Sequence, residues 1–397
     1  MRPARQVFAR LRPSSRRVPW TFGVLFAALA SLAGASSSLF GACGPFTDVT
    51  DAVFCPFVLE IFTLGITTGT TAATYDPTGD VSRLQMAAFL ARTVDQSLRR
   101  GSRRTARREF FTPQNSQSLG VTALPGAVGP TLAASDGADV WVSNPGAGVV
   151  YRVRSSDGVL QETWTGATGA KGVLSAMGQI LVTGRESPGL LYRIDPSQSA
   201  GAVTTVSSQL GNTVNGIAFD GSVVWTANGG GSISRLTPSA SIPWTVTTTS
   251  GFPRLEGILY DGANIWVADF GAGTLLKLDG SASVLQTVTV GGNPFYPAFD
   301  GTNIWVPTGS QVSVVRASSG AILATLTGNG VSGSHSASFD GERVLVTNIS
   351  SQVASVWKAA DLSEIGFFPL GAEPLGVCSD GANFWIALVS SNQLARF

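Results

Sequence analysis

Charge, histidine and cysteine are scarce in this chain of 397 residues. Only 13% of the residues are charged, and the formal net charge is +1. Residues 110–397 contain 12 basic and 18 acidic residues, so this part carries a net charge of −6 and is a poor candidate for binding nucleic acid. With one histidine and no Cys-x-x-Cys spacing, the sequence contains no zinc-binding pattern.

Glycine and apolar residues, by contrast, are abundant. The chain has 47 glycines and is 44% hydrophobic, a composition typical of a β protein whose strands are joined by glycine turns. Its length allows two or three domains. After residue 35, no segment is apolar enough to cross a membrane.

The first 35 residues have the pattern of an export signal. Six arginines precede the apolar run FGVLFAALASLAGA (22–35), which ends in small residues suited to cleavage after Ala35. We therefore expect a secreted protein of the cell envelope or cell surface. Two alternatives stay open. One is an uncleaved membrane anchor, since the run is slightly shorter than a typical span of about 20 residues. The other is lipidation of Cys43 in the segment LFGAC.

Three cysteines follow the expected cleavage site. Because an exported chain reaches an oxidising compartment, and because the two residues are close in sequence, Cys43 and Cys55 are expected to form a disulfide. Cys378 would be left over, and we expect it to be a small buried apolar residue.

Residues 44–98 are expected to form a small helical module. One helix is predicted from apolar residues at helical spacing, which share a face: Phe54, Phe57, Val58 and Ile61. A second helix is predicted to begin at Ser82, an N-cap that Gln85 can complete as a capping box. Its apolar face would comprise Met86, Phe89, Leu90 and Val94.

The order of short motifs in this module resembles the S-layer homology module. The matching motifs are FTDV (46–49), Gly65-Ile66-x-x-Gly69, Tyr75-x-Pro77 and VSRxQM (81–86). The resemblance implies association with cell-wall polysaccharide, with Arg83 near the ligand. There is a single copy, however, and the usual Trp after the DV motif and the DG after the GI motif are missing. A folded spacer that binds no sugar is therefore an alternative.

Residues 99–115 are expected to be a basic linker. Its segment RRGSRRTARR (99–108) has six arginines among small polar residues, a composition typical of a solvated and mobile stretch. One hypothesis is electrostatic adhesion to anionic envelope polymers or lipid head groups. The alternative is a simple spacer.

A motif built on Asp-Gly and an aromatic residue recurs along the rest of the chain. It occurs seven times with spacings of 39 to 43 residues, for example as FDGTNIWVP (299–307). The turn glycines are Gly137, Gly178, Gly221, Gly262, Gly301, Gly341 and Gly381. Each unit divides into four short strands with turn residues between them, and no segment of helical period intervenes.

Seven four-stranded units predict an all-β fold, a seven-bladed β-propeller over residues 116–397. The last unit ends after three strands, and the segment SQSLGVTALP (116–125) is expected to supply the missing outer strand of that blade. The Asp-Gly step predicts a hairpin turn, and the tryptophan in the second strand is expected to pack between blades. Leu181 and Leu345 take the place of this tryptophan in two units.

The repeats resemble the YVTN/NHL-type propellers of exported bacterial proteins. The pattern of strand, Gly-x-x-Pro, strand, Asp-Gly and Trp is present in residues 284–306 and 364–386. The resemblance implies the fold, but such propellers include binding platforms, assembly factors and some enzymes.

A candidate site lies where the inner strands begin. Five residues before each Asp-Gly aspartate, the seven units place Thr131, Gly172, Asn215, Glu256, Phe295, His335 and Leu375, and Lys171 is an alternative to Gly172 because that turn is one residue shorter. We call these seven equivalent positions the column. His335 is the sole histidine of the chain, and Glu256 is the one acid of the column. The two are expected to face a common channel mouth.

Two functions follow from this column. The first is a binding platform whose recognition residues are Asn215, Arg254, Asn293, Phe295, Tyr296 and Glu373, with a protein or glycan of the cell envelope as the partner and no cofactor. The propeller is expected to be monomeric. The alternative is a metal-dependent enzyme with His335 as general base and Glu256 on magnesium or calcium, the arrangement implied by a similarity to streptogramin lyases. A structural surface-layer component is a third possibility.

Overall fold

The structure is a computed structural model that describes residues 43, 45–51, 53–63, 66–90, 93 and 120–397. The chain divides into two compact units, Met1–Ser97 and Leu98–Phe397. The expected export signal (1–35) and basic linker (99–115) lie outside the described residues. None of the helices in the described part of the chain is long and apolar enough to span a bilayer.

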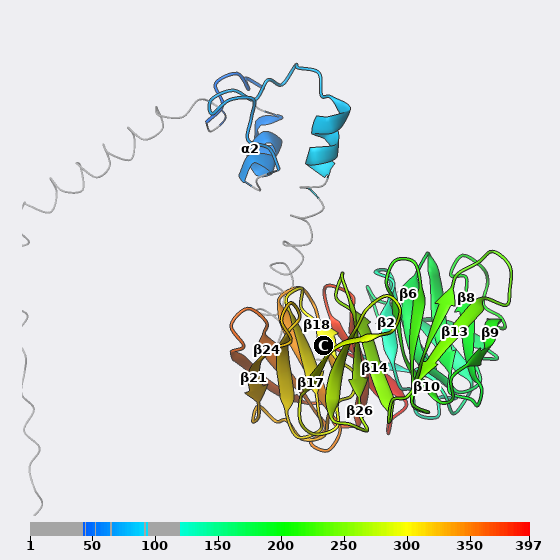
Figure 1. Cartoon of the computed structure of the whole chain (residues 1–397). Coiled ribbons are helices and arrows are strands. Elements are labelled where there is room, and N and C mark those ends of the chain that lie inside the picture. The colour runs from blue at the N-terminus through cyan, green and yellow to red at the C-terminus, as the bar shows by residue number, and fades with distance from the viewer. Residues whose placement is uncertain (1–42, 44, 52, 64–65, 91–92, 94–119) are drawn as a thin grey trace, which may run out of the picture. The chain divides into compact units, whose positions relative to one another are not determined.

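The second unit consists of seven antiparallel sheets of four strands each, which we number as blades in chain order (Figure 1). Blade 1 comprises β2 (Ala133–Ser135), β3 (Asp139–Asn144), β4 (Val149–Arg154) and β5 (Leu160–Thr165). Blade 2 comprises β6 (Ala170–Ala176), β7 (Gln179–Gly184), β8 (Gly189–Ile194) and β9 (Thr204–Leu210). Blade 3 comprises β10 (Val214–Phe219), β11 (Val224–Asn228), β12 (Ser232–Thr237) and β13 (Thr245–Ser250).

The remaining four blades follow the same order from the inner to the outer strand. Blade 4 comprises β14 (Leu255–Tyr260), β15 (Ile265–Asp269), β16 (Thr274–Leu278) and β17 (Val284–Thr289). Blade 5 comprises β18 (Ala298–Phe299), β19 (Asn303–Pro307), β20 (Val312–Arg316) and β21 (Ile322–Leu326). Blade 6 comprises β22 (Ser334–Phe339), β23 (Arg343–Asn348), β24 (Val353–Lys358) and β25 (Glu364–Pro369).

Blade 7 closes the ring with strands from both ends of the unit. It contains β26 (Pro374–Ser379), β27 (Phe384–Leu388) and β28 (Gln393–Arg396), with β1 (Gly120–Ala123) as its outer strand. Strand β1 pairs antiparallel with β28, and Val121 lies opposite Ala395. The seven-bladed all-β fold and its closure by the N-terminal strand are therefore confirmed.

Each interface between neighbouring blades contains its own apolar cluster. Trp305 of blade 5, for example, is fully buried against Val344 and Val346 of blade 6. Leu345 replaces the tryptophan in blade 6, and it packs in the same way against Phe384 of blade 7. The predicted packing role of the repeated aromatic residue is confirmed, and leucine fills the same position.

The repeated Asp-Gly step serves both the turn and the tryptophan. Asp300 accepts hydrogen bonds from the backbone N–H of Asn303 (2.6 Å) and from the indole N–H of Trp305 (2.8 Å). Gly301 has a φ of 93°, which glycine adopts without steric cost. The same carboxylate–indole bond, at 2.7–2.8 Å, occurs in the pairs Asp136–Trp141, Asp220–Trp225, Asp261–Trp266 and Asp380–Trp385.

Basic side chains then join several of these tryptophans to the next blade. The Arg235 guanidinium lies over the Trp225 ring at 5.6 Å and donates a hydrogen bond to the Gly280 carbonyl of blade 4 (2.6 Å). Lys277 lies over Trp266 and reaches Ala317 of blade 5 in the same way. The motif that dominates the sequence is therefore part of the frame.

The small first unit is built around a disulfide and helix α2 (Cys55–Thr63). Cys43 and Cys55, which were expected to pair, are joined with a Cα–Cα distance of 5.5 Å. The buried core contains Cys43, Phe46, Val49 and Val58, with Cys55, Leu59 and Phe62 packed against it.

The predicted apolar face of the first helix is wrong in part. Phe54 and Phe57 are 62% and 61% exposed, and the buried stripe passes instead through Cys55, Val58, Leu59 and Phe62. The disulfide fixes Cys55 toward the core, and residues three, four and seven positions later then share its face. Phe54 and Phe57 lie off that face.

The second predicted helix begins as expected, over residues 83–90. The Gln85 side chain accepts the Ser82 backbone N–H (2.8 Å), and the Gln85 N–H is directed to Ser82 Oγ (3.3 Å), which is a capping box. Met86 and Leu90 are exposed rather than buried. Val94 lies outside the described residues.

Two motif residues of the first unit have structural roles. The Asp48 carboxylate accepts the backbone N–H groups of Tyr75 (2.9 Å) and Asp76 (2.7 Å), and the Tyr75 hydrogen bond is the main reason that the pKa of Asp48 is lowered. Phe46 packs edge-on against Phe62, with the ring centroids 5.0 Å apart. The FTDV segment therefore holds this unit together.

Candidate functional site at the propeller axis

Irregular strand pairing directs the column side chains away from their own sheets. In blade 3, the pairing of β10 with β11 shifts between Val214 and Gly216, and Asn215 lies in the shift. In blade 6 the shift lies between Ser334 and Ser336, and it contains His335. The inner strands of blades 2, 4 and 7 have the same irregularity. A β-bulge re-aims a side chain, so the bulges place this column toward the axis of the ring.

A glycine after the column residue identifies the member from blade 2. A Cβ on Gly216 would lie 2.6 Å from the Glu256 carbonyl of the next blade, so the inner strands approach closely there. Gly172 has the same environment, with the Asn215 carbonyl 2.9 Å from a Cβ built on it. Gly172 is therefore the spacer, and Lys171 is the column residue of blade 2.

Blade 5 departs from this pattern and inserts an aromatic ring. Its inner strand β18 has two residues, because Pro294 and Pro297 interrupt the preceding segment. The Tyr296 backbone pairs with blade 6 instead, donating to the His335 carbonyl (3.0 Å). Its side chain is buried and contacts residues of blades 2, 4 and 6. We call Lys171, Asn215, Glu256, Tyr296 and His335 the axial cluster.

Glu256 is a paired carboxylate at the centre of this cluster. It is 5% exposed, and its Oε1 accepts two hydrogen bonds from the Arg254 guanidinium, at 2.7 and 3.1 Å. Its Oε2 accepts the Tyr296 hydroxyl at 3.2 Å. Burial, and then the neighbouring Glu256 charge, raise the pKa of Tyr296 well above its ordinary value, so Tyr296 stays protonated and donates.

Lys171 carries an ammonium group into the axis. The residue is 8% exposed, and its Nζ lies over the Tyr296 ring at 5.8 Å, a contact between blades 2 and 5. Burial lowers the pKa of Lys171 to about 8, opposed by the Glu256 carboxylate and assisted by the charge of Arg185. The group is therefore mostly charged at neutral pH.

His335 is buried among aromatic rings. It is 6% exposed, with its ring centroid 4.8 Å from that of Phe295 and 5.2 Å from that of Tyr296. Burial, and then the charge of Lys171, lower the pKa of His335 to about 3. A hydrogen bond with the Leu375 backbone acts in the opposite direction and raises this pKa. The imidazole is therefore neutral at pH 7 and a weak base. It is a poor general base, because an efficient one has a pKa near the working pH.

A line of rings connects the cluster with the surface. The Phe270 and Phe295 rings meet edge-on at 5.1 Å, and the Arg254 guanidinium lies 4.1 Å from the centroid of Phe270. Arg254 is exposed, and Phe270 and Phe295 are half-buried. Aromatic and guanidinium groups therefore run continuously from the rim into the axis.

Other predicted binding residues are not part of this arrangement. Asn293 is exposed, and Glu373 is half-buried; their backbones bond to Thr308 and to Ser390 and Val389, respectively. Arg83 belongs to the first unit, where it is exposed at the start of the helical stretch 83–90. Sequence reasoning missed Phe270 and Arg185, and it placed Lys171 second to Gly172. The glycine shared by Gly172, Gly216, Gly257 and Gly376 could have identified Lys171.

The residues at the axis do not fit a magnesium or calcium ion. These ions prefer six or more oxygen ligands, commonly with several carboxylates. Here Glu256 is the single acid, both of its oxygens have protein partners, and the Lys171 and Arg254 cations lie nearby. The part of the chain that the structure describes contains no group of three or more His, Cys, Asp or Glu residues that could hold a metal.

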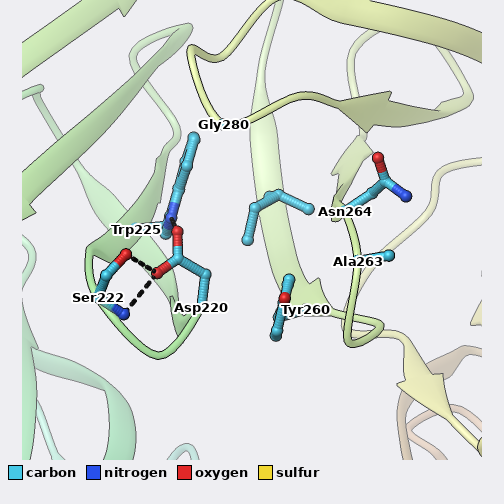
Figure 2. Close-up of a pocket in the computed structure, with 8 residues that line it drawn as sticks. Asp220, Ser222, Trp225, Tyr260, Ala263, Asn264 and Gly280 are labelled. Atoms are coloured by element: carbon cyan, nitrogen blue, oxygen red, sulfur yellow. Dashed lines mark hydrogen bonds between the residues drawn. The ribbon is translucent and has the colours of Figure 1, made fainter.

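A pocket of about 230 Å³ lies between blades 3 and 4, at the opposite end of β14 from Glu256. Figure 2 shows Asp220, Ser222 and Trp225 on one side and Tyr260, Ala263 and Asn264 on the other. The Asp220 carboxylate bonds to Trp225 (2.8 Å) and Ser222 (2.9 Å), and the Tyr260 hydroxyl donates to the Gly262 carbonyl (2.7 Å). The Asp220 and Tyr260 side chains are thus engaged in turns of the propeller, and the axis, with its buried charged groups, is the stronger candidate site.

The fold and this axial site define a seven-bladed propeller with a polar axis. No protein family and no curated protein matches the chain in sequence. Similar solved structures include a streptogramin B lyase (15% identity, TM-score 0.58, 70% of this chain and 96% of that one). They also include virginiamycin B lyase from Staphylococcus aureus (17%, 0.59, 70% and 98%) and the WD40 propeller domain of Doa1 (14%, 0.57, 70% and 97%). At these identities the likeness shows the fold alone.

Proposed function

We propose that the chain is an exported protein of the bacterial cell envelope or surface whose propeller is a binding platform. The partner, a protein or glycan of the envelope, contacts the axial end of the propeller at Arg254, Phe270 and Phe295. The first unit, by its resemblance to the S-layer homology module, associates with cell-wall polysaccharide through Arg83. The pattern of residues 1–35 supports the proposed export.

One observation carries the proposal for the propeller. The Arg254, Phe270 and Phe295 side chains form a partly exposed surface that continues into a buried polar cluster. Interfaces are enriched in aromatic and arginine residues because these bury large areas and still offer hydrogen bonds. The axial cluster needs no metal or cofactor for such a role.

Sedimentation of the full chain with isolated cell-envelope material tests both parts. We expect Phe295→Ala to weaken binding about 10-fold or more, as for a central interface aromatic. The matched control is Phe367→Ala, because Phe367 is an exposed aromatic residue of outer strand β25. Arg83→Ala should lower sedimentation with purified wall polysaccharide and leave binding at the propeller unchanged.

Equal sedimentation of the Phe295→Ala and Phe367→Ala variants would refute the platform at this face. A metal-dependent lyase makes a different prediction, because its activity needs no envelope partner. Opening of a cyclic ester or lactone that requires magnesium and is abolished by His335→Ala would replace the binding function.

A further inference from the structure

Three polar groups of the axial cluster lack partners of their own. Asn215 Oδ1 and His335 Nδ1 are buried atoms that have no hydrogen-bond partner in the structure. Within the described residues, the Lys171 ammonium makes no hydrogen bond or ion pair. It lies over the Tyr296 ring and, unlike the other two atoms, keeps some contact with solvent. All three residues are more than nine-tenths buried. Such groups are costly unless something satisfies them.

These groups differ in what they require. The Lys171 ammonium has three N–H donors and needs acceptors. The Asn215 oxygen is an acceptor, and so is Nδ1 of a neutral His335 that is protonated at Nε2; both need donors. A ligand that fits must therefore accept at one point and donate at two others. Hydroxyl groups next to an anionic group have this combination.

The charges at this end of the axis favour an anion. Glu256 is already paired with Arg254, whereas Lys171 and the nearby Arg185 carry positive charge without a carboxylate within ion-pair distance in the described chain. Other carboxylates, such as buried Asp269 beside Arg254, also lie at this end of the propeller, so the group that favours an anion is the unpaired Lys171 ammonium rather than a net positive charge.

We propose that the axial cluster binds a sugar acid, such as a uronic acid residue of an acidic polysaccharide. Lys171 pairs with the carboxylate, and Asn215 and His335 accept hydrogen bonds from the hydroxyl groups. The Phe295 ring, next to His335, covers the apolar face of the sugar ring. This inference deepens the proposed binding function and rests on it, since it specifies the partner as an acidic glycan.

Calorimetric titration of the full chain with three small probes tests this assignment. D-Glucuronate has the carboxylate and the hydroxyls, glucose has only the hydroxyls, and acetate has only the carboxylate. We expect glucuronate to bind about 10-fold or more tightly than either of the others, since it satisfies donors and acceptors together. Tighter binding of polygalacturonate than of galacturonate would identify a polymer, rather than a free sugar acid, as the source.

Variants assign the contacts. Lys171→Met should weaken glucuronate binding about 30-fold or more, because it removes the cation. Lys358→Met is the matched control, since Lys358 is an exposed lysine of β24, and it should leave the affinity unchanged. Asn215→Leu should weaken glucuronate about 10-fold and acetate less than about 2-fold. Thermal unfolding shows whether each variant is folded. One folded axial variant, Lys171→Met or Asn215→Leu, is sufficient for the test.

Three results would overturn the inference. The first is no binding of glucuronate up to about 50 mM, which would mean that water alone satisfies these groups. The second is equal affinity of Lys171→Met and the wild type. The third is tighter binding of glycylglycine than of glucuronate, which would assign the site to a peptide carboxylate. None of these three results changes the sedimentation of Phe295→Ala with envelope material. The binding platform and its assignment to a sugar acid are therefore tested separately.

Discussion

In the propeller, each of the seven blade interfaces has its own apolar cluster, whereas the described part of the small first unit has a single cluster of four buried apolar residues and a disulfide. Phe54, Phe57, Met86 and Leu90 of the small unit are exposed. The difference follows from geometry, because a closed ring covers both faces of every sheet, while each of the two short helices described in the first unit, α2 and the stretch 83–90, leaves large apolar side chains exposed. A repeat thus stabilises itself, and a small unit needs a covalent link.

The largest expected effect is on a blade interface. Trp305→Ala should lower the free energy of unfolding of the propeller by about 3–5 kcal/mol, because it empties a fully buried site. Trp305→Leu should cost clearly less, since leucine occupies this position in blades 2 and 6. Denaturant titration measures both. Equal losses would show that the indole–Asp300 bond, rather than packing, controls the interface.

The second effect is on the axis and depends on pH. Because burial lowers the pKa of Lys171 to about 8, the folded protein loses this proton before the unfolded chain does, and stability rises from pH 8 to pH 10.5. Compared with that of Lys171→Met, the free energy of unfolding of the wild type should therefore increase by an amount on the order of 3 kcal/mol over this range. Denaturant titrations of both proteins at pH 7.5 and 10.5 measure the gain. Parallel pH profiles would mean that Lys171 is well solvated.

The third effect is confined to the small unit. Replacing Cys43 and Cys55 by serine should destabilise it by about 2–3 kcal/mol, as expected for a 12-residue separation. Limited proteolysis with mass spectrometry should find faster cleavage in residues 43–93 and an unchanged rate in residues 120–397. Faster cleavage in both units would contradict their independence.

The smallest effect is expected at the exposed rings of the same unit. Phe54→Ser and Phe57→Ser should change its stability by less than about 0.5 kcal/mol, because neither side chain is buried. Val58→Ala, one residue from Phe57, should cost about 1–3 kcal/mol. Proteolysis rates of the three variants give the comparison. A large loss at Phe54 or Phe57 would reveal a partner that covers this face.

The fold could be predicted from sequence because its determinants are local. Trp305 lies five residues after Asp300, to which it bonds, and four after Gly301 of the same turn. Each unit therefore contains the residues that determine its own hairpin. The axial site could be predicted only in part. Asn215, Glu256 and His335 were placed at the axis by register, but the shorter turn at Met177-Gly178 shifted Lys171 out of the column.

The pairing of Glu256 could not be predicted in this way. Its bonds to Arg254 and Tyr296 depend on side-chain rotamers and on the prolines that shorten β18, which no repeat period encodes. The face of α2 was misjudged for a similar reason. Four apolar residues at helical spacing allow several orientations, and the bond between Cys43 and Cys55 selects one.

Closure of blade 7 also has a consequence for the order of folding. Strand β1 has its hydrogen-bonding partner in β28, so its pairing must wait until nearly the whole propeller has been synthesised. Contacts between such distant segments slow folding, and an unpaired β28 would leave an open sheet edge in the meantime. Until β1 pairs with β28, blade 7 has three strands and the ring is not closed. At that stage, a chaperone in the compartment where the chain folds would protect the open edge of β28.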